Sequence, residues 1–372
     1  MGAWVVSSSV ISPLGFTSEE NYSKIKQQIS GLSKISDATL SVNPYFAGHI
    51  ATLHSSSAHT KFEIMCRKAA EVALNKINLD PSRTLYILST TKGNIELLKT
   101  VVGNAERLAL HVTAKWLASE AGFQNYLVVS NACISGVLAL IVGKRFLDAE
   151  KYDHVVVVGA DVLSQFVVAG FESLHALSSE SCKPFDADRK GVNLGEAAAA
   201  VVLSSKPKAL GVLPSIKITG GGLSNDANHI SGPSRTGIEL GLAVRQALKE
   251  AQKSSTAIDF ISAHGTATLF NDEMEAKAFH ALGMGNIPVH SLKGYFGHTL
   301  GAAGVVETIM SVHSLLNNEV LASKGFDKLG VSVPINICKE LIKKPLTTSL
   351  KTASGFGGCN AAIILQKESY SL

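Results

Sequence analysis

Four side chains that support covalent and acid–base chemistry stand at separate places in this sequence. Cys133 supplies a thiol, His264 and His298 supply imidazoles, and Lys293 supplies an ammonium group. A thiolate attacks carbonyl carbon, an imidazole transfers protons or donates hydrogen bonds, and an ammonium group stabilises negative charge. A fold that brings the four together would form a nucleophilic site suited to covalent catalysis.

Cys133 lies between a short apolar segment at 126–130 and a longer apolar segment that begins at Ser135. The first pattern predicts a buried strand and the second a helix, so the thiol stands on a strand-to-helix turn. Because the positive end of a helix dipole lowers a cysteine pKa, this position favours a thiolate nucleophile. Packing as a small buried hydrophobe is the alternative, and the local sequence leaves both open.

Both histidines stand next to glycine-rich segments. His264 ends an apolar run before Gly-Thr-Ala-Thr, and His298 precedes Thr-Leu-Gly-Ala-Ala-Gly, whose small residues predict a closely packed helix starting at the histidine. The segment Ser-Gly-Phe-Gly-Gly at 354–358 is a turn able to aim backbone N–H groups at an oxyanion. Alone, each motif is more typical of a structural histidine or a plain turn, whereas together they favour a site.

The elements that must position these residues follow from hydrophobic patterning. Strands are predicted at 85–89, 126–130, 154–159, 197–203, 260–263, 287–291 and 361–366. Amphipathic helices are predicted at about 62–76 and about 237–252. The alternation predicts an α/β protein whose helices cover the faces of buried sheets, with functional residues at the carboxyl edge.

The two halves of the chain weakly repeat one another. In each half, a helix leads to a buried strand, and a later strand, turn and helix follow at Cys133 and at His298. The segment 204–215 contains the proline, glycine and lysine of a crossing between halves. We therefore predict two tightly fused halves, 1–205 with the cysteine and 206–372 with the histidines and the lysine.

Composition excludes several classes of protein. The 372 residues are 46% hydrophobic and 17% charged, which is typical of a globular chain, and the formal net charge of +4 suits an acidic partner better than nucleic acid. Five dispersed cysteines do not form a disulfide or zinc framework, so a reducing cytoplasm is expected. The start of the sequence lacks a signal-peptide pattern, and no apolar run is long enough to predict a membrane span.

Several blocks of this sequence, in the same order, resemble the signature blocks of the β-ketoacyl-acyl carrier protein synthases, the decarboxylating condensing enzymes of fatty-acid and polyketide synthesis. The blocks lie at 5–15, 131–136, 184–196, 224–233, 264–268, 293–304 and 355–358. The resemblance implies a thiolase-like fold, in which two duplicated α/β halves form a layered α-β-α-β-α arrangement. It also implies a 3-oxoacyl-[acyl carrier protein] synthase of the Cys-His-His type.

The resemblance implies a role for each matching residue. Cys133 would take the acyl group, His264 and His298 would stabilise an enolate as neutral donors, and Lys293 would support the histidines. The remaining residues would form the oxyanion hole and gate (Phe356, Gly357), bind substrate (Thr266, Thr268, Asp226, His229, Lys92) and support the site from the layer behind it (Glu307).

The expected substrates are acyl and malonyl thioesters on an acyl carrier protein, with no metal and no cofactor beyond the carrier's phosphopantetheine. A homodimer is expected, or a heterodimer with a related subunit. The segment before Cys133 is short for the family, Lys92 replaces an apolar pocket residue, and the usual Asn-Ser-Phe before Gly-Phe-Gly-Gly is Thr-Ala-Ser here. A specialised polyketide or polyene ketosynthase with a non-catalytic chain-length partner is therefore the alternative.

Overall fold

A computed structural model describes residues 2–37, 39–41, 44–75, 77–100, 105–212, 215–227 and 232–368. In this part of the chain, eleven strands form one sheet in the order β13-β11-β10-β15-β16-β9-β1-β8-β6-β4-β5. Their bounds are β1 (Ala3–Ile11), β4 (Thr84–Ser89), β5 (Asn125–Val129), β6 (His154–Asp161), β8 (Ala197–Ser204), β9 (Ile216–Asn225), β10 (Phe260–Ser262), β11 (Pro288–His290), β13 (Asn336–Ile337), β15 (Thr348–Gly355) and β16 (Cys359–Lys367).

The sheet consists of two copies of one five-strand pattern. The first copy runs β5-β4-β6-β8-β1 and the second runs β11-β10-β15-β16-β9, with β13 added at the outer edge. In both copies the first three strands are parallel and the next two steps are antiparallel. The copies join where Ala3 and Trp4 of β1 pair with Ile218 and Lys217 of β9. This repeat confirms the duplicated α/β architecture.

Nine α-helices pack around these strands in the described residues. They are α1 (Ser18–Lys26), α2 (Lys61–Leu74), α3 (Leu110–Glu120), α4 (Ser135–Asp148), α5 (Gln165–Ser173), α6 (Ile238–Glu250), α7 (Leu269–Ala281), α8 (Lys293–Phe296) and α9 (Ala303–Asn317). Shorter strands pair separately, β2 (Leu32–Ile35) and β7 (Leu194–Gly195) with β3 (Tyr45–Gly48), and β12 (Glu319–Val320) with β14 (Ile342–Lys343). No helix among the described residues is long and apolar enough to cross a membrane.

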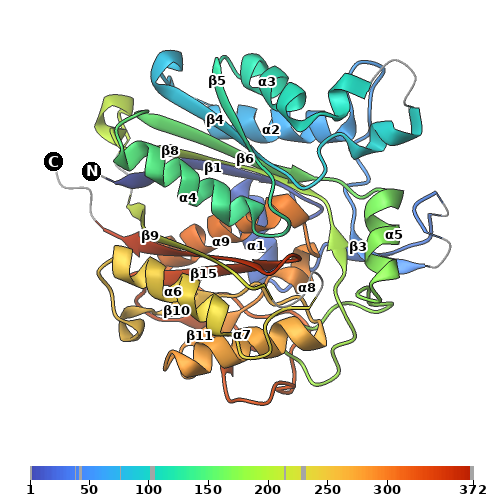
Figure 1. The fold of residues 1–372 in the computed structure, drawn as a ribbon, viewed down its shortest axis with the longest axis vertical. Coiled ribbons are helices and arrows are strands. Elements are labelled where there is room, and N and C mark those ends of the chain that lie inside the picture. Colours follow the sequence, from blue (N-terminus) through green and yellow to red (C-terminus); the bar gives the residue numbers. More distant parts are fainter. Residues whose placement is uncertain are drawn as a thin grey trace.

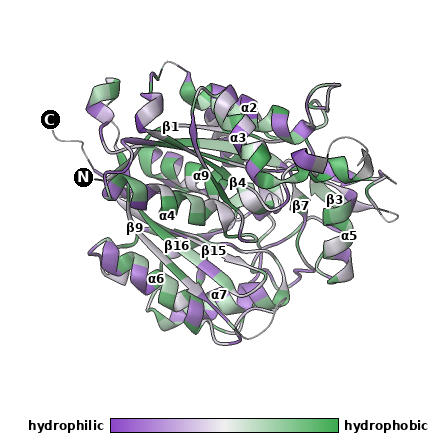
Figure 2. Cartoon of the chain, turned by 45° about the horizontal axis from the view of Figure 1, so that its top comes forward, coloured by the Kyte–Doolittle hydropathy of each residue, from purple (hydrophilic) through white to green (hydrophobic). Residues whose placement is uncertain are grey.

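The helices form three layers around the two copies of the pattern. Helices α4 and α9 contact strands of both copies and lie between them, whereas α2 and α3 cover the outside of the first copy and α6 covers the second (Figure 1). The central helices α4 and α9 contribute to the largest apolar cluster. The outer helices α6 and α7 alternate hydrophilic and hydrophobic residues (Figure 2). The order of layers is therefore α-β-α-β-α, as expected for the thiolase-like fold.

The strands form where the chain is apolar or small on both faces. All eight residues of β6, which include a run of four valines, and all eight of β8 are buried. Each of these strands has a helical layer on both sides, so an uninterrupted apolar run is stable there. Helix α2 begins with a capping box, in which the Thr60 side chain and the Glu63 carboxylate satisfy each other's backbone N–H groups.

The seven predicted strands and the two predicted amphipathic helices are all present, with ends shifted by at most two residues. Two long central strands, β9 and β15, lay outside those predictions. In β9 the run Gly220-Gly-Gly222 hides the strand pattern; a Cβ atom at Gly222 would lie 1.9 Å from the Ala243 carbonyl oxygen of α6. The change from the first copy to the second falls between Ser204 and Ile216, and the domain boundary at 205 stays a prediction.

Candidate active site

Cys133 lies on the turn between β5 and α4. The preceding residue, Ala132, has a φ of 44°, a left-handed conformation that a non-glycine residue adopts at some energetic cost. The Ser135 hydroxyl stabilises the turn, since it accepts the Asn131 N–H at 2.8 Å and donates to the Ala132 carbonyl at 2.7 Å. The thiol is thus held at the carboxyl edge of the sheet.

The expectation of a low cysteine pKa is wrong for this resting structure. Burial, reinforced by the neighbouring Cys359 thiol, raises the pKa of Cys133 to about 12. The Lys293 charge and a hydrogen bond from the Phe356 backbone N–H oppose this shift without reversing it. Helix α4 begins at Ser135, two residues later, and burial outweighs its dipole. The thiol is therefore protonated until a base takes its proton.

His264 follows β10 and is held by carboxylates from α7. Glu275 accepts the backbone N–H of His264 at 2.8 Å and of Gly265 at 2.6 Å. Asp272 accepts the N–H groups of Thr266 and Ala267 at 3.0 and 3.2 Å. Buried carboxylates that accept several backbone N–H groups fix the path of the loop, and so fix where the imidazole can lie.

His298 comes from the loop between α8 and the 3-10 turn Leu300–Ala302. The prediction that His298 begins a helix needs correction, because α9 starts at Ala303 and the 3-10 turn Leu300–Ala302 lies between them. The His298 N–H donates to the Asn193 carbonyl at 2.7 Å, and its Nδ1 accepts the Leu300 N–H at 3.3 Å. Since Nδ1 is the acceptor, the neutral ring carries its proton on Nε2.

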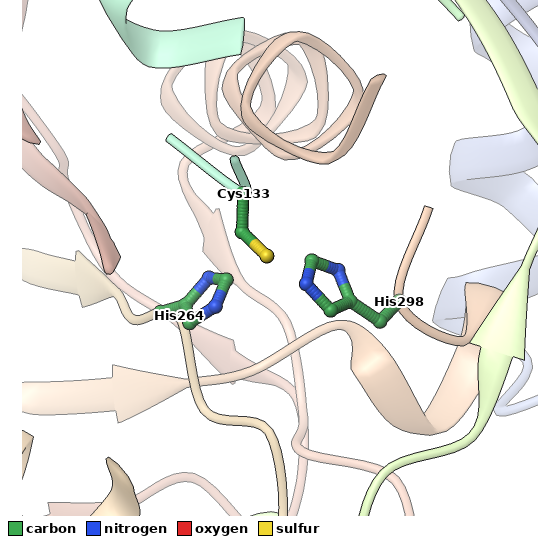
Figure 3. Close-up of side chains that lie close together, drawn as sticks. All are labelled: Cys133, His264 and His298. Carbon is green, nitrogen blue, oxygen red and sulfur yellow. The ribbon is translucent and has the colours of Figure 1, made fainter. Parts of the chain in front are cut away.

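The three side chains converge in front of the turn (Figure 3). The Cys133 sulfur and a ring nitrogen from each histidine lie within 4.8 Å of one another. The imidazole rings are nearly perpendicular, with centroids 5.1 Å apart. Within the described residues, Nδ1 of His264 and Nε2 of His298 have no hydrogen-bond partner, so both are open to a substrate.

Both imidazoles are neutral. Burial and then the Lys293 charge lower the pKa values of His264 and His298 well below that of a free histidine. A protonated imidazole would have to be desolvated beside an ammonium group, which is costly. Each ring is therefore a hydrogen-bond donor without a net charge, as predicted from the sequence.

Lys293 lies behind the histidines and is fully buried. Its ammonium group pairs with the Glu307 carboxylate, which also binds Lys351 at 2.7 Å. Lys351 was missed by the sequence reasoning, although a lysine in the apolar segment Leu-Lys-Thr-Ala is a usable signal of a buried charge. The pairing with Lys293 places Glu307 where the sequence analysis expects a supporting residue.

A cavity of about 510 Å³ leads from the surface to these side chains. Cys133, His264 and His298 line it together with Thr266, Thr268 and Phe356. Thr266 and Thr268 bond to each other through their hydroxyls at 2.8 Å. The Phe356 ring packs against Phe171, which also contacts His298 edge-on, and this second aromatic residue was not predicted.

Two family models match successive parts of the chain, and the boundary between them falls within or just after the crossing segment. "Beta-ketoacyl synthase, N-terminal domain" matches residues 99–209, which include Cys133, and "Beta-ketoacyl synthase, C-terminal domain" matches residues 216–327, which include both histidines. The chain belongs to the β-ketoacyl synthase family. Lys351 and Phe356 of this β-ketoacyl synthase lie beyond the matched ranges.

Curated relatives agree with the family. The chain is 34% identical to 3-oxoacyl-[acyl-carrier-protein] synthase 2 of Rhizobium meliloti (strain 1021) over 257 residues, and 32% identical to nodulation protein E of Rhizobium leguminosarum bv. trifolii over 248. These alignments cover 65% and 64% of this β-ketoacyl synthase. In both cases the match spans 61% of the length of the relative.

Solved structures share the whole fold. A β-ketoacyl synthase from Burkholderia phymatum STM815 superposes with a TM-score of 0.88 at 22% identity and covers 98% of this chain and 99% of that one. A ketosynthase in complex with its chain length factor, from Xenorhabdus doucetiae, gives 0.85 at 24% identity with 98% of each chain covered. At these identities the likeness establishes the thiolase-like fold alone.

Some predicted residues of this β-ketoacyl synthase lie away from the cavity. The Lys92 N–H donates to the Asp161 carboxylate at 3.2 Å, and Lys92 is absent from the cavity lining, as is Asp226, among the residues described. Gly357 lies in the hairpin between β15 and β16 with a φ of 86°. His229 lies outside the described residues. The substrate-binding roles of Lys92, Asp226 and His229 stay predictions, as does the oxyanion-hole and gating role of Gly357.

Proposed function

We propose that this protein is a 3-oxoacyl-[acyl carrier protein] synthase, which joins an acyl group to malonyl-acyl carrier protein with loss of CO₂. The convergence of Cys133 with two neutral histidines, within 4.8 Å at the bottom of one cavity, is the observation that carries this proposal. A nucleophile beside two uncharged donors suits a reaction that needs both an acyl-enzyme and a stabilised enolate.

The first step moves the acyl group onto the enzyme. The Cys133 thiol loses its proton, its sulfur attacks the carbonyl carbon of the acyl thioester, and the C–S bond to the carrier breaks. The departing carrier thiolate takes up one proton, so no net charge is created. Because burial raises the pKa of Cys133 to about 12, a neutral histidine beside the sulfur would take its proton during attack.

The second step generates the carbon nucleophile. When the malonyl carboxylate leaves as CO₂, the electron pair of the broken C–C bond moves onto the thioester as an enolate. The Nε2–H of His298 and a ring N–H of His264 would donate hydrogen bonds to the enolate oxygen. Lys293, buried behind them, would add a fixed positive charge.

The third step joins the two carbon fragments. The enolate carbon attacks the acyl carbonyl on Cys133, and the resulting oxyanion would accept the backbone N–H groups of Cys133 and Phe356. The Phe356 N–H already points at the Cys133 sulfur, which supports this placement. Collapse of the intermediate breaks the C–S bond and releases a 3-oxoacyl carrier two carbons longer, while the thiolate regains a proton.

The partners in this proposal are an acyl carrier protein and a second synthase subunit. One solved relative in fold is a type II polyketide synthase acyl-carrier protein in complex with its ketosynthase, and another is a ketosynthase with its chain length factor. Strand β5 is the last strand of the sheet and is partly exposed over residues 125–128, so its edge could pair with a second copy or with a chain-length subunit. All five cysteines are free, which fits the expected cytoplasm.

Intact-mass analysis of the protein after incubation with acyl carriers of several chain lengths tests this proposal. We expect one acyl group per chain on the native protein and none on Cys133→Ser. A serine hydroxyl is a much weaker nucleophile than a cysteine thiolate, so it should not attack the thioester. Cys359→Ser, which alters the neighbouring thiol, is the matched control and should load normally. Acylation of Cys133→Ser, or failure of every acyl carrier to load the native protein, would contradict the proposal.

A further inference from the structure

Two buried lysine side chains behind the histidines share a single carboxylate, that of Glu307. One carboxylate oxygen of Glu307 on α9 forms an ion pair with Lys293 of α8. The other oxygen forms an ion pair with Lys351 of β15 at 2.7 Å. Both lysine side chains have 0% exposure, and that of Glu307 has 4%. Two ammonium groups face the Glu307 carboxylate, so the two lysines exceed this one carboxylate by one positive charge. Since burying an uncompensated charge is costly, a purely structural ion pair would not need the second lysine.

Lys351 also holds the strand end that leads to His264. Its Nζ donates to the carbonyls of Ser262 and Ala263, each at 3.3 Å, and to its own neighbour Thr352 at 2.5 Å. In the sheet, Lys351 pairs with Ser262, two residues before the histidine. Through Glu307 the same ammonium group is tied to α9, whose partner Lys293 stands behind His298. One side chain thus links the supports of both imidazoles.

Further titratable groups face the cluster of Lys293, Lys351 and Glu307 from the neighbouring elements. Lys293 and Lys351 both act on His264 and His298, and Glu307 acts on both lysines. From α7 the Glu275 carboxylate, and from β11 the His290 ring, also interact with Lys351. Burial lowers the pKa of Lys351, and the Glu307 carboxylate opposes that shift. The 2.7 Å ion pair supports an ammonium group at this position.

We propose that Lys351 is a positioning residue for decarboxylation: it fixes the end of β10 that carries His264, and it places a second positive charge beside the two imidazoles that disfavours their protonation. This inference rests on the proposed function, because neutral donors matter only if an enolate forms. It assigns a role to a residue beyond the segment that the family models match.

The variant Lys351→Met keeps the length of the side chain and removes its charge, leaving Lys293 paired with Glu307. Without the excess charge, both imidazoles protonate more readily. We expect the acid limb of the malonyl-carrier decarboxylation rate to move up by about one pH unit, with the rate near pH 8 less affected. Lys144→Met removes a buried lysine that pairs with Asp148 and Glu250 elsewhere, and it should leave the acid limb in place.

The double variant Lys351→Met/Glu307→Gln distinguishes an effect of the charge of Lys351 from an effect of the altered packing. It removes one cation and one anion, so Lys293 again leaves a single positive charge in excess, and the acid limb should return toward the native position. Imidazole ¹⁵N chemical shifts during a pH titration report the histidine protonation directly. We expect His264 and His298 to titrate at higher pH in Lys351→Met than in the native protein.

The outcomes distinguish the inference from the proposed function. If the native protein does not decarboxylate malonyl carrier, the proposed function fails, while the ¹⁵N titration still tests the effect of the charge. If the native protein is active and folded Lys351→Met shows native histidine titration and a native acid limb, the inference is overturned. An acid limb that stays displaced in the double variant would also overturn the charge argument.

Discussion

At the scale of single residues, the tautomer of His298 decides which hydrogen bond the site can offer. Its Nδ1 accepts the Leu300 N–H, and Nε2 lies open toward the cavity without a partner in the described part of the chain. A neutral imidazole with its proton on Nε2 is a donor aimed at the substrate. Such a donor stabilises an enolate oxygen as it forms, but does little for the attack of Cys133 on a thioester.

His298→Ala should therefore slow malonyl decarboxylation by about 10²–10³-fold, the usual loss when one donor to a developing oxyanion is removed. Cys133 should still become acylated in this variant, as measured by intact mass. His280→Ala, on the exposed face of α7, is the control and should retain both activities. Loss of acylation with decarboxylation preserved would instead place His298 in the loading step.

At the scale of elements, the close contact of α4 with α9 places the Cys133 turn against the His298 segment. Gly136 and Gly304 meet at this crossing, where a Cβ atom on Gly136 would lie 2.7 Å from the Val305 nitrogen and 2.9 Å from the Gly304 Cα. Backbone atoms cannot move aside as a flexible side chain can. The small residues after His298 therefore do allow the close helix packing that the sequence predicts.

Gly136→Ala should lower the free energy of unfolding by about 1–3 kcal/mol, because it overpacks this crossing. Gly170→Ala, in α5 where an added methyl meets no atom within 4 Å, should be neutral or raise stability by up to about 1 kcal/mol. Denaturant unfolding of the two variants at equal protein concentration measures the difference. Equal stability of both variants would show that an added methyl group at the contact of α4 with α9 can be accommodated without strain.

At the scale of the whole molecule, burying several neutral histidines makes the fold sensitive to acid. Burial lowers the pKa of His290 on β11 to about 3, with the Lys351 charge as the next cause. Below the unfolded value of about 6.5, the unfolded chain binds a proton that the folded chain does not. The contribution of His290 to stability is therefore complete above pH 6.5 and is lost as the pH falls toward 3.

His290→Phe should remove that sensitivity at one position. Between pH 6.5 and 4.5 the free energy of unfolding of the native protein should fall more steeply than that of the variant, by about 1.4 kcal/mol per pH unit. Urea unfolding at several pH values measures both slopes, and the difference cancels groups common to the two proteins. Identical slopes would mean that His290 is protonated in the folded protein.

Much of the site could be read from the sequence because the chemistry is local to short motifs. The apolar run before Cys133, the glycine turn at 355–358 and the segments around His264 and His298 specify strand ends and turns by themselves. Parallel strands share a carboxyl edge, so these ends were expected to meet. Resemblance to the β-ketoacyl synthases then supplied a role for each residue.

Only the tertiary structure decided the protonation of Cys133 and the ion pairs of Lys351. The pKa of Cys133 rises because burial outweighs the helix dipole, and burial depends on the packing of both halves. Lys351 reaches Glu307 because α9 packs against β15, and it reaches the Ser262 carbonyl because β15 pairs with β10 in one register, across 89 residues of sequence. The backbone N–H of Lys92, just after β4, donates to the Asp161 carboxylate, and Lys92 is not among the residues that line the cavity. Sequence spacing determines which groups reach the sheet edge, whereas the charge on each group follows from the neighbours that long-range packing brings to it.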